Sequence, residues 1–162
     1  MPTARSNDTS AERSVDAVRA AARLAKVAGT ALFDVDLTLP QYRVLVFLAA
    51  GERPASHVAA LLGVAPSTVT AAVDGLTARG LVERRADPDD RRRVVLANTA
   101  DGRQLLRRGD AVVAARLDRL LQFLSDDEAD TVLTGLAHLN RAMEHSLAER
   151  FGPPGSNDPG RP

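Results

Sequence analysis

Two short stretches of the chain concentrate side chains that donate hydrogen bonds or carry positive charge. The first stretch contains Ser67, Thr68, Thr70 and Ala71. The second is a run of acids, Asp87, Asp89 and Asp90, followed at once by Arg91, Arg92 and Arg93. Short hydroxyl side chains suit phosphates and base edges, and a guanidinium suits the narrow minor groove of DNA. This chemistry is that of binding rather than of bond making.

Composition and motifs exclude several other classes of protein. The 162 residues contain no Cys, which excludes disulfide scaffolds, zinc fingers and thiolate catalysis by this chain. We find no P-loop, no G-x-G-x-x-G and no G-x-S-x-G, so we expect neither an enzyme nor a cofactor. His138 and His145 lie two helical turns apart, too far for one metal ion, so no metal site is expected.

The distribution of charge leaves room for one basic region. Lys plus Arg and Asp plus Glu both number 21, which excludes a cationic coat over the whole protein. From Arg79 to Arg108, however, the chain has nine arginines and only five acidic residues, a local excess of positive charge. No apolar run is long enough to span a membrane, and the polar N-terminus lacks a secretory signal, so we expect a cytoplasmic protein without a membrane partner.

Several short helices must position the first stretch, which we call the hydroxyl cluster (Ser67, Thr68, Thr70 and the neighbouring Ala71). Apolar spacing predicts a helix over about 11–34, and Thr38 with Pro40 marks the start of another that Gly51 ends. Two further helices, about 54–62 and 66–78, are joined by the tight connector 63–66. Two short helices joined in this way are typical of a helix-turn-helix.

After Gly80 the spacing of apolar residues changes from a helical pattern to a strand-like one, which predicts a β-hairpin. Residues 81–84 and 93–97 are strand candidates, and Asp87–Pro88 suits a turn between them. A charged hairpin directly after a helix-turn-helix is a wing. We therefore predict a mainly α fold with a small β-hairpin wing: a winged helix-turn-helix over about 37–98.

Two long helices complete the predicted domain. Thr99 can cap a helix to about Leu124, and Ser125 to Glu128 reads as a capping box for a last helix to about 151. The apolar stripes at 15–32 and 132–151 have no partner left within one small domain, so we predict a homodimer through helices at about 11–34 and 100–151. The single domain is thus 11–151, between disordered tails at 1–10 and 152–162.

In the helix at 66–78, Val69, Val73 and Leu76 must face the core. The hydroxyl cluster then lies on the opposite face near the helix N-terminus, where a phosphate is also favoured. One alternative stays open, that Ser67 and Thr68 merely help to start the helix. A charged turn is ordinarily a solvated surface, but the position of this one at the tip of a hairpin after a helix-turn-helix favours a role in binding.

The run from Gly63 to Gly102 resembles the MarR family of winged helix-turn-helix regulators. Matching pieces are LTLPQ at 37–41, PSTVT at 66–70, L-x-x-R-G-L-V-x-R from Leu76 to Arg84, D-R-R at 90–92 and T-x-x-G at 99–102. The order of helices matches over about 12–150.

The resemblance implies a homodimer that binds a palindromic double-stranded DNA operator, usually as a repressor released by a small phenolic or aromatic ligand. It implies that Arg92 enters the minor groove with Asp90 orienting it, and that Ser67, Thr68, Thr70 and Ala71 face the groove. Tyr42 and Arg43 lie near the expected ligand cleft, although Arg43 could equally pair with Asp34 or Asp36.

Three residues depart from the family pattern. Ala65 stands where a capping Ser is common, Ala71 where some members carry a base-reading Arg, and Asn98 where an apolar residue is frequent. Ala65 and Ala71 keep an alternative open: a winged helix that docks a protein partner and no longer reads an operator.

Overall fold

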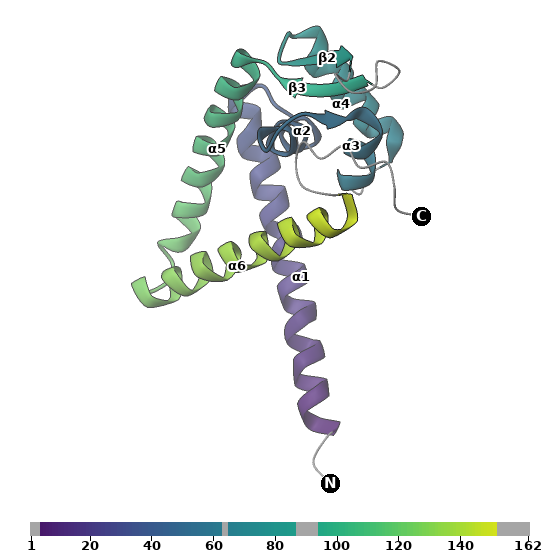
Figure 1. Ribbon diagram of the computed structural model, residues 1–162. Coiled ribbons are helices and arrows are strands. Elements are labelled where there is room, and N and C mark those ends of the chain that lie inside the picture. The colour runs from purple at the N-terminus through teal and green to yellow at the C-terminus, as the bar shows by residue number, and fades with distance from the viewer. Residues whose placement is uncertain (1–3, 63–64, 87–93, 152–162) are drawn as a thin grey trace.

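The computed structural model describes residues 4–62, 65–86 and 94–151 and is mainly helical (Figure 1). The elements in chain order are α1 (Ala4–Leu32), the 3-10 turn η1 (Phe33–Val35), α2 (Leu39–Ala49), β1 (Arg53–Pro54), α3 (Ala55–Leu62), α4 (Pro66–Ala78), β2 (Val82–Ala86), β3 (Val94–Asn98), α5 (Ala100–Leu121) and α6 (Asp126–Phe151). The predicted fold class, a winged helix-turn-helix with long helices before and after it, is confirmed. No described helix is long and apolar enough to cross a membrane.

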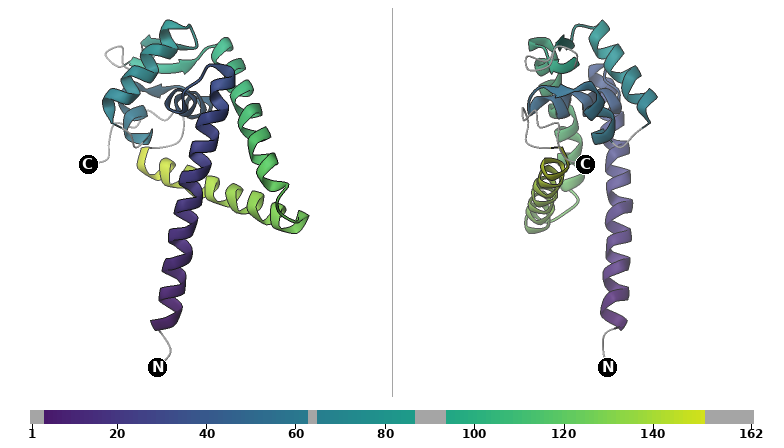
Figure 2. Two further views of the ribbon diagram at one scale, coloured as in Figure 1. Left: turned by 180° about the vertical axis from the view of Figure 1, so that it is seen from behind. Right: turned by 45° about the vertical axis from the view of Figure 1, so that its right-hand side comes forward.

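The molecule divides into a lobe and helical arms. Helices α2, α3 and α4 and the small sheet form the lobe, while α1 and α5 extend away from it on one side (Figures 1 and 2). Helix α6 starts at the far end of α5 and runs back toward the lobe. The largest fully buried side chains are Leu32, Leu37, Val44, Leu45, Val58, Leu76, Val82 and Leu96. The core therefore lies inside the lobe and includes the end of α1.

The sheet has three antiparallel strands in the order β1-β3-β2. Strands β2 and β3 pair as predicted, from Val82 opposite Asn98 to Ala86 opposite Val94. Strand β1 was not predicted, and it pairs Arg53 with Leu96 and Pro54 with Val95. A strand of two residues shows no alternation, and one of its residues is a proline, which ordinarily argues against a strand.

The three helix starts at which a capping side chain was predicted, those of α2, α5 and α6, have that cap. Thr38 and Gln41 cap α2 reciprocally, and the Thr99 hydroxyl accepts the Gly102 amide at 3.0 Å at the start of α5. At α6 the Ser125 amide and hydroxyl both donate to the Glu128 carboxylate. These two bonds stabilise the ionised form of Glu128 and lower its pKa. The caps predicted at Thr38 and Thr99 and the capping box predicted at Ser125 are therefore confirmed, and the reciprocal bond from Gln41 is an addition.

The ends of α1, α5 and both long strands differ from those predicted. Helix α1 begins at Ala4, so residues 4–10, assigned to a tail from their polar composition, continue the helix. They contain neither Gly nor Pro, so nothing in them breaks a helix. Helix α5 ends at Leu121 rather than near Leu124, and each long strand begins one residue later than expected. The predicted tail at 152–162 lies outside the described residues.

Gly102 lets α5 approach the strand start, and its replacement should destabilise the lobe. A Cβ there would lie 2.0 Å from the Leu81 carbonyl oxygen, which also accepts the Thr99 amide at 3.1 Å and so is not free to move. Gly102→Ala should cost on the order of 1–3 kcal/mol or more in urea unfolding followed by circular dichroism. The control is Gly29→Ala in α1, whose Cβ would make only an ordinary contact and should stabilise by about 0.5–1 kcal/mol. Equal stability of the two variants would contradict this account.

Candidate nucleic-acid interface

Helix α4 buries one face and exposes the other. Val69, Ala72, Val73 and Leu76 are buried, and Leu76 is wholly inaccessible. Ser67, Thr68, Thr70 and Ala71 are all exposed. This division follows from a period of 3.6 residues and confirms the predicted core positions. The polar residues singled out by sequence therefore lie together on the outer side of the first turns of α4.

The hydroxyl groups on this outer side are not equivalent. The Thr70 hydroxyl donates to the Pro66 carbonyl of its own helix at 3.0 Å, so only its acceptor capacity remains. The hydroxyls of Ser67 and Thr68 make no hydrogen bond within the part of the chain that the structure describes. They are thus the two side-chain hydroxyls of α4 that can donate to an external acceptor.

The start of α4 is left without a side-chain cap. Ala65 occupies the N-cap position and makes no side-chain hydrogen bond, while its carbonyl accepts the Thr68 amide at 2.9 Å. Pro66 supplies no N–H group. A helix N-terminus with no capping side chain keeps its partial positive charge exposed, which favours a phosphate.

Strand β2 is tied to the lobe on both of its faces. Arg84 pairs with Asp74 of α4, and Arg85, pointing to the opposite face, pairs with Glu83 and Glu52. The Glu83 carboxylate, and then Glu52, raise the pKa of Arg85. Sequence analysis missed both ties, although alternation along the strand would have separated the two arginines. The base of the wing is thereby held against α4.

The predicted wing-tip residues Asp90, Arg91, Arg92 and Arg93 lie outside the described residues. What the structure gives is the pair of strands that leads to and from them, ending at Ala86 and starting again at Val94. The roles of these four side chains therefore stay predictions.

The two predicted ligand residues already have protein partners. The Tyr42 hydroxyl donates to Asp110 of α5 at 2.6 Å, and Arg43 donates to the Leu62 carbonyl at 2.6 Å. Burial, and then the bond to Asp110, raise the pKa of Tyr42, so the phenol keeps its proton. The pairing suggested for Arg43 with Asp34 or Asp36 is wrong. Those carboxylates contact Arg116 at 3.7 Å and Arg79 at 3.4 Å.

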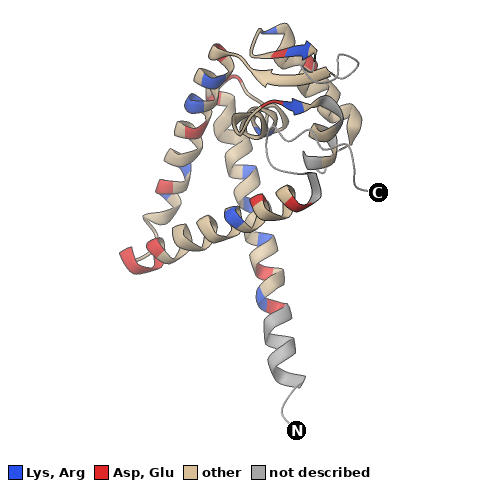
Figure 3. Cartoon of the chain, viewed as in Figure 1, with Lys and Arg blue, Asp and Glu red and all other residues tan. Residues whose placement is uncertain are grey.

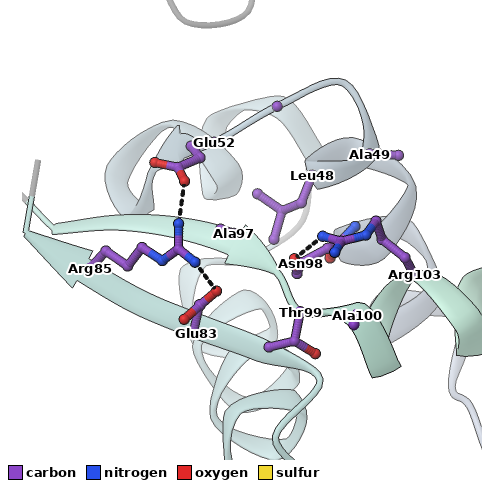
Figure 4. Close-up of a pocket in the computed structure, with 11 residues that line it drawn as sticks. Leu48, Ala49, Glu52, Glu83, Arg85, Ala97, Asn98, Thr99, Ala100 and Arg103 are labelled. Carbon is purple, nitrogen blue, oxygen red and sulfur yellow. Dashed lines mark hydrogen bonds and ion pairs between the residues drawn. The ribbon is translucent and has the colours of Figure 1, made fainter.

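A hollow of about 480 Å³ opens on the face of the sheet that carries Arg85 (Figure 4). Arg85 lies between Glu52 and Glu83, and Arg103 reaches from α5 to the Asn98 carbonyl at 2.7 Å. Neither Tyr42 nor Arg43 lines this hollow. Because Arg84 contacts α4 from the other face, the hollow lies on the side of the sheet away from α4.

Charge is unevenly distributed along the arm formed by α5 and α6 (Figure 3). Arg103, Arg107 and Arg108 lie in the half of α5 next to the lobe. The turn at the remote end is followed by Asp126, Asp127 and Glu128. A polyanion is therefore repelled from the far end of the arm and favoured toward the lobe.

Comparison with known proteins agrees with this geometry. Residues 35–93, most of the lobe, match the model of the MarR family. The chain is 33% identical over 116 residues to the uncharacterized HTH-type transcriptional regulator YfiV of Bacillus subtilis, covering 71% of this chain and 72% of that protein. A MarR-family transcriptional regulator from Rhodococcus sp. RHA1 superimposes with a TM-score of 0.66 at 30% identity, over 80% of this chain and 93% of that one. The chain belongs to the MarR family.

This MarR-family chain also resembles a regulator whose complexes are known. The transcriptional repressor CouR, bound to a 23-mer DNA duplex, is 35% identical with a TM-score of 0.63, covering 77% of this chain and 89% of that one. CouR of Rhodococcus jostii RHA1 bound to p-coumaroyl-CoA is 31% identical with a TM-score of 0.60, covering 75% and 87%. The chain is accordingly a transcriptional regulator with a winged helix fold.

Proposed function

We propose that this chain represses transcription by binding a palindromic operator as a homodimer and that a small aromatic or phenolic ligand releases it. The observation that carries the proposal is the outer side of α4, where Ser67 and Thr68 expose hydroxyls beside an uncapped helix N-terminus. The width of the DNA major groove matches an α-helix presented in this way. The repressor CouR, bound to DNA, has the same fold.

DNA recognition divides between α4 and the wing. Ser67 and Thr68 donate to phosphates or base edges, Thr70 accepts, and Ala71 offers a methyl group. Arg92 enters the minor groove and Asp90 orients it, with Arg91 and Arg93 contributing positive charge. Since Ala71 cannot read a base by hydrogen bonding, specificity depends strongly on the wing and on the shape of the DNA.

The exposed apolar side chains of the arms support the homodimer. Helix α6 has no buried residue among its described side chains, and Leu139 is 53% exposed. Further exposed apolar residues of the arms are Val15, Val18, Leu120, Phe123, Leu124, Val132, Leu133 and Met143. Apolar surface on this scale marks an interface, and a second copy of the same arms offers a matching one.

For the ligand we propose Tyr42 and Arg43 of α2 as contacts. Tyr42 offers an aromatic ring next to α5 and Arg43 a guanidinium next to the end of α3, and these two groups suit an aromatic acid or phenol. Because both polar groups already have partners, a ligand that uses them must displace Asp110 or the Leu62 carbonyl. CouR, the relative bound to p-coumaroyl-CoA, makes an aromatic ligand the first class to examine.

Removal of the two available hydroxyls of α4 should weaken DNA binding without changing the fold. Ser67→Ala and Thr68→Ala should each reduce operator affinity roughly fivefold, the value of one hydrogen bond. The control is Thr77→Ala in the last turn of α4, whose hydroxyl bonds to the Val73 carbonyl, and it should leave DNA affinity unchanged. Fluorescence anisotropy with labelled operator measures all three. Wild-type chain that shows no DNA binding even at low salt would instead favour a protein-docking winged helix.

The wing should contribute through one arginine above all. Arg92→Ala should cost on the order of 1–3 kcal/mol of operator affinity and lower the salt dependence by about one ion. Asp90→Ala should cost less, because the charge remains and only its direction is freed. Arg93 follows Arg92 by one position, and alternation along an extended chain would turn its side chain to the opposite side. Arg93→Ala is therefore the matched control, for which we expect a smaller loss. If the folded, dimeric Arg92→Ala variant binds operator with wild-type affinity, the proposed role of the wing in DNA binding is wrong.

Dimerisation should depend on the apolar face of α6. Replacing Leu136 and Leu139 together with Asp places two charges on that face and should abolish the dimer, with loss of operator binding. Sedimentation equilibrium measures the association state. The control is Asp127→Asn, a substitution at an exposed acidic residue of α6. A stable wild-type monomer, or a monomeric variant that still binds operator tightly, would overturn this part of the proposal.

A further inference from the structure

One hydrogen bond joins the lobe to the arm between residues far apart in sequence. Tyr42 of α2 donates its phenolic proton to the Asp110 carboxylate of α5 at 2.6 Å, the short length expected of a charge-assisted bond. Asp110 is exposed and Tyr42 half-buried, so the bond lies at the edge of the core. It is a direct polar link from α2 of the lobe to the long helix α5.

Gly109 makes this contact possible. A Cβ on Gly109 would lie 3.1 and 3.2 Å from two Tyr42 ring carbons and 3.4 Å from a Leu32 methyl group. The ring therefore packs directly on the backbone of α5, and Leu32 at the end of α1 lies against the same glycine. A glycine inside a helix costs about 1 kcal/mol relative to alanine, and the close packing of the ring accounts for its presence here.

The contact lies where the burial of α5 decreases, although Val112 and Val113 just beyond it still pack partly buried against the core. Leu105, Leu106 and Gly109 are buried, and every α5 side chain beyond them is half-buried or exposed. The twelve residues from Asp110 to Leu121 span about 16 Å along the helix, so a rotation of roughly 10° at Tyr42 moves the far end by about 3 Å. The other polar tie farther out, Arg116 with Asp34 at 3.7 Å, is largely exposed and adds little.

We propose that Tyr42 and Asp110 are positioning residues that fix the angle between lobe and arm. In a dimer joined through its arms, this angle sets the separation of the two α4 helices and therefore the half-site spacing that the protein prefers. The inference rests on the proposed function, because it needs a dimer that binds two half-sites. Tyr42 then acts through Asp110 and α5 rather than by touching DNA.

Operator spacing is the readout that a merely stabilising contact would not change. Duplexes are made with the half-sites at the preferred separation, roughly one helical turn, and about one base pair closer or farther. Wild type should favour one spacing sharply. Tyr42→Phe and Asp110→Ala should each reduce that preference about threefold or more, and the double variant should resemble the single ones. Asp110→Asn keeps an oxygen acceptor and should change the preference less than Asp110→Ala.

A second measurement tests the angle without DNA. The chain has no Cys, so spin labels can be placed at two introduced cysteines, Ala78→Cys at the end of α4 and Ala115→Cys on α5, both exposed. Labelled chain is mixed with excess unlabelled chain so that only distances within one chain are measured. The distance distribution should be narrow in wild type and broader or displaced in Tyr42→Phe.

The two failures are distinguishable. If wild type binds no duplex, the proposed function fails, and the spin-label distances alone decide the inference. The inference is overturned if Tyr42→Phe leaves both the spacing preference and the distance distribution unchanged. It is also overturned if Asp110→Asn disturbs the spacing preference as much as Asp110→Ala, because the hydrogen bond would then not be the positioning element.

Discussion

The burial of one face of α4 constrains everything that this chain offers to a partner. Leu76 is fully buried and Val69 and Val73 nearly so, which fixes the rotation of the helix about its axis. A shift of register by one residue would turn each side chain by about 100° and carry the hydroxyl cluster away from solvent. The same 3.6-residue period therefore sets both the packing of the lobe and the polar surface that it exposes.

Much of this arrangement could be predicted because its causes are local. The caps at Thr38, Thr99 and Ser125 depend on residues three positions away, and the buried face of α4 depends on spacing within one helix. Strand β1 could not be predicted, because only its pairing with β3 makes it a strand. The bond between Tyr42 and Asp110 joins residues 68 positions apart, and no local pattern in either helix signals it.

For Asn98, one property could be predicted from the sequence and another could not. The residue stands out as polar at a position that is frequently apolar in the family, and the structure places it in the core at 6% exposure. Its side-chain amide donates to the Leu45 carbonyl at 2.8 Å and so ties β3 to α2. Its side-chain oxygen is buried with no partner among the described residues, a cost of about 1–3 kcal/mol. The polar substitution was visible in the sequence, but its use as an inter-element tie was not.

Lobe and arms are specialised for different contacts. The lobe holds nearly all of the buried core and exposes polar groups on α4, whereas the arms expose apolar side chains and become acidic at their remote end. The arms therefore have an apolar surface that the lobe does not cover, and this surface is the reason for proposing a homodimer. In the proposed homodimer, the junction of α2 and α5 would connect the dimer contacts of the arms to the DNA contacts of the lobe.

Selection of bound duplexes from a random pool tests the central claim, that a dimer reads DNA symmetrically, most directly. The purified chain is incubated with the pool at near-physiological salt, and retained duplexes are sequenced over successive rounds. The account predicts enrichment of a pseudo-palindrome whose half-sites are roughly one helical turn apart, bound by two chains. Enrichment of no sequence, or of an asymmetric site bound by one chain, would contradict it.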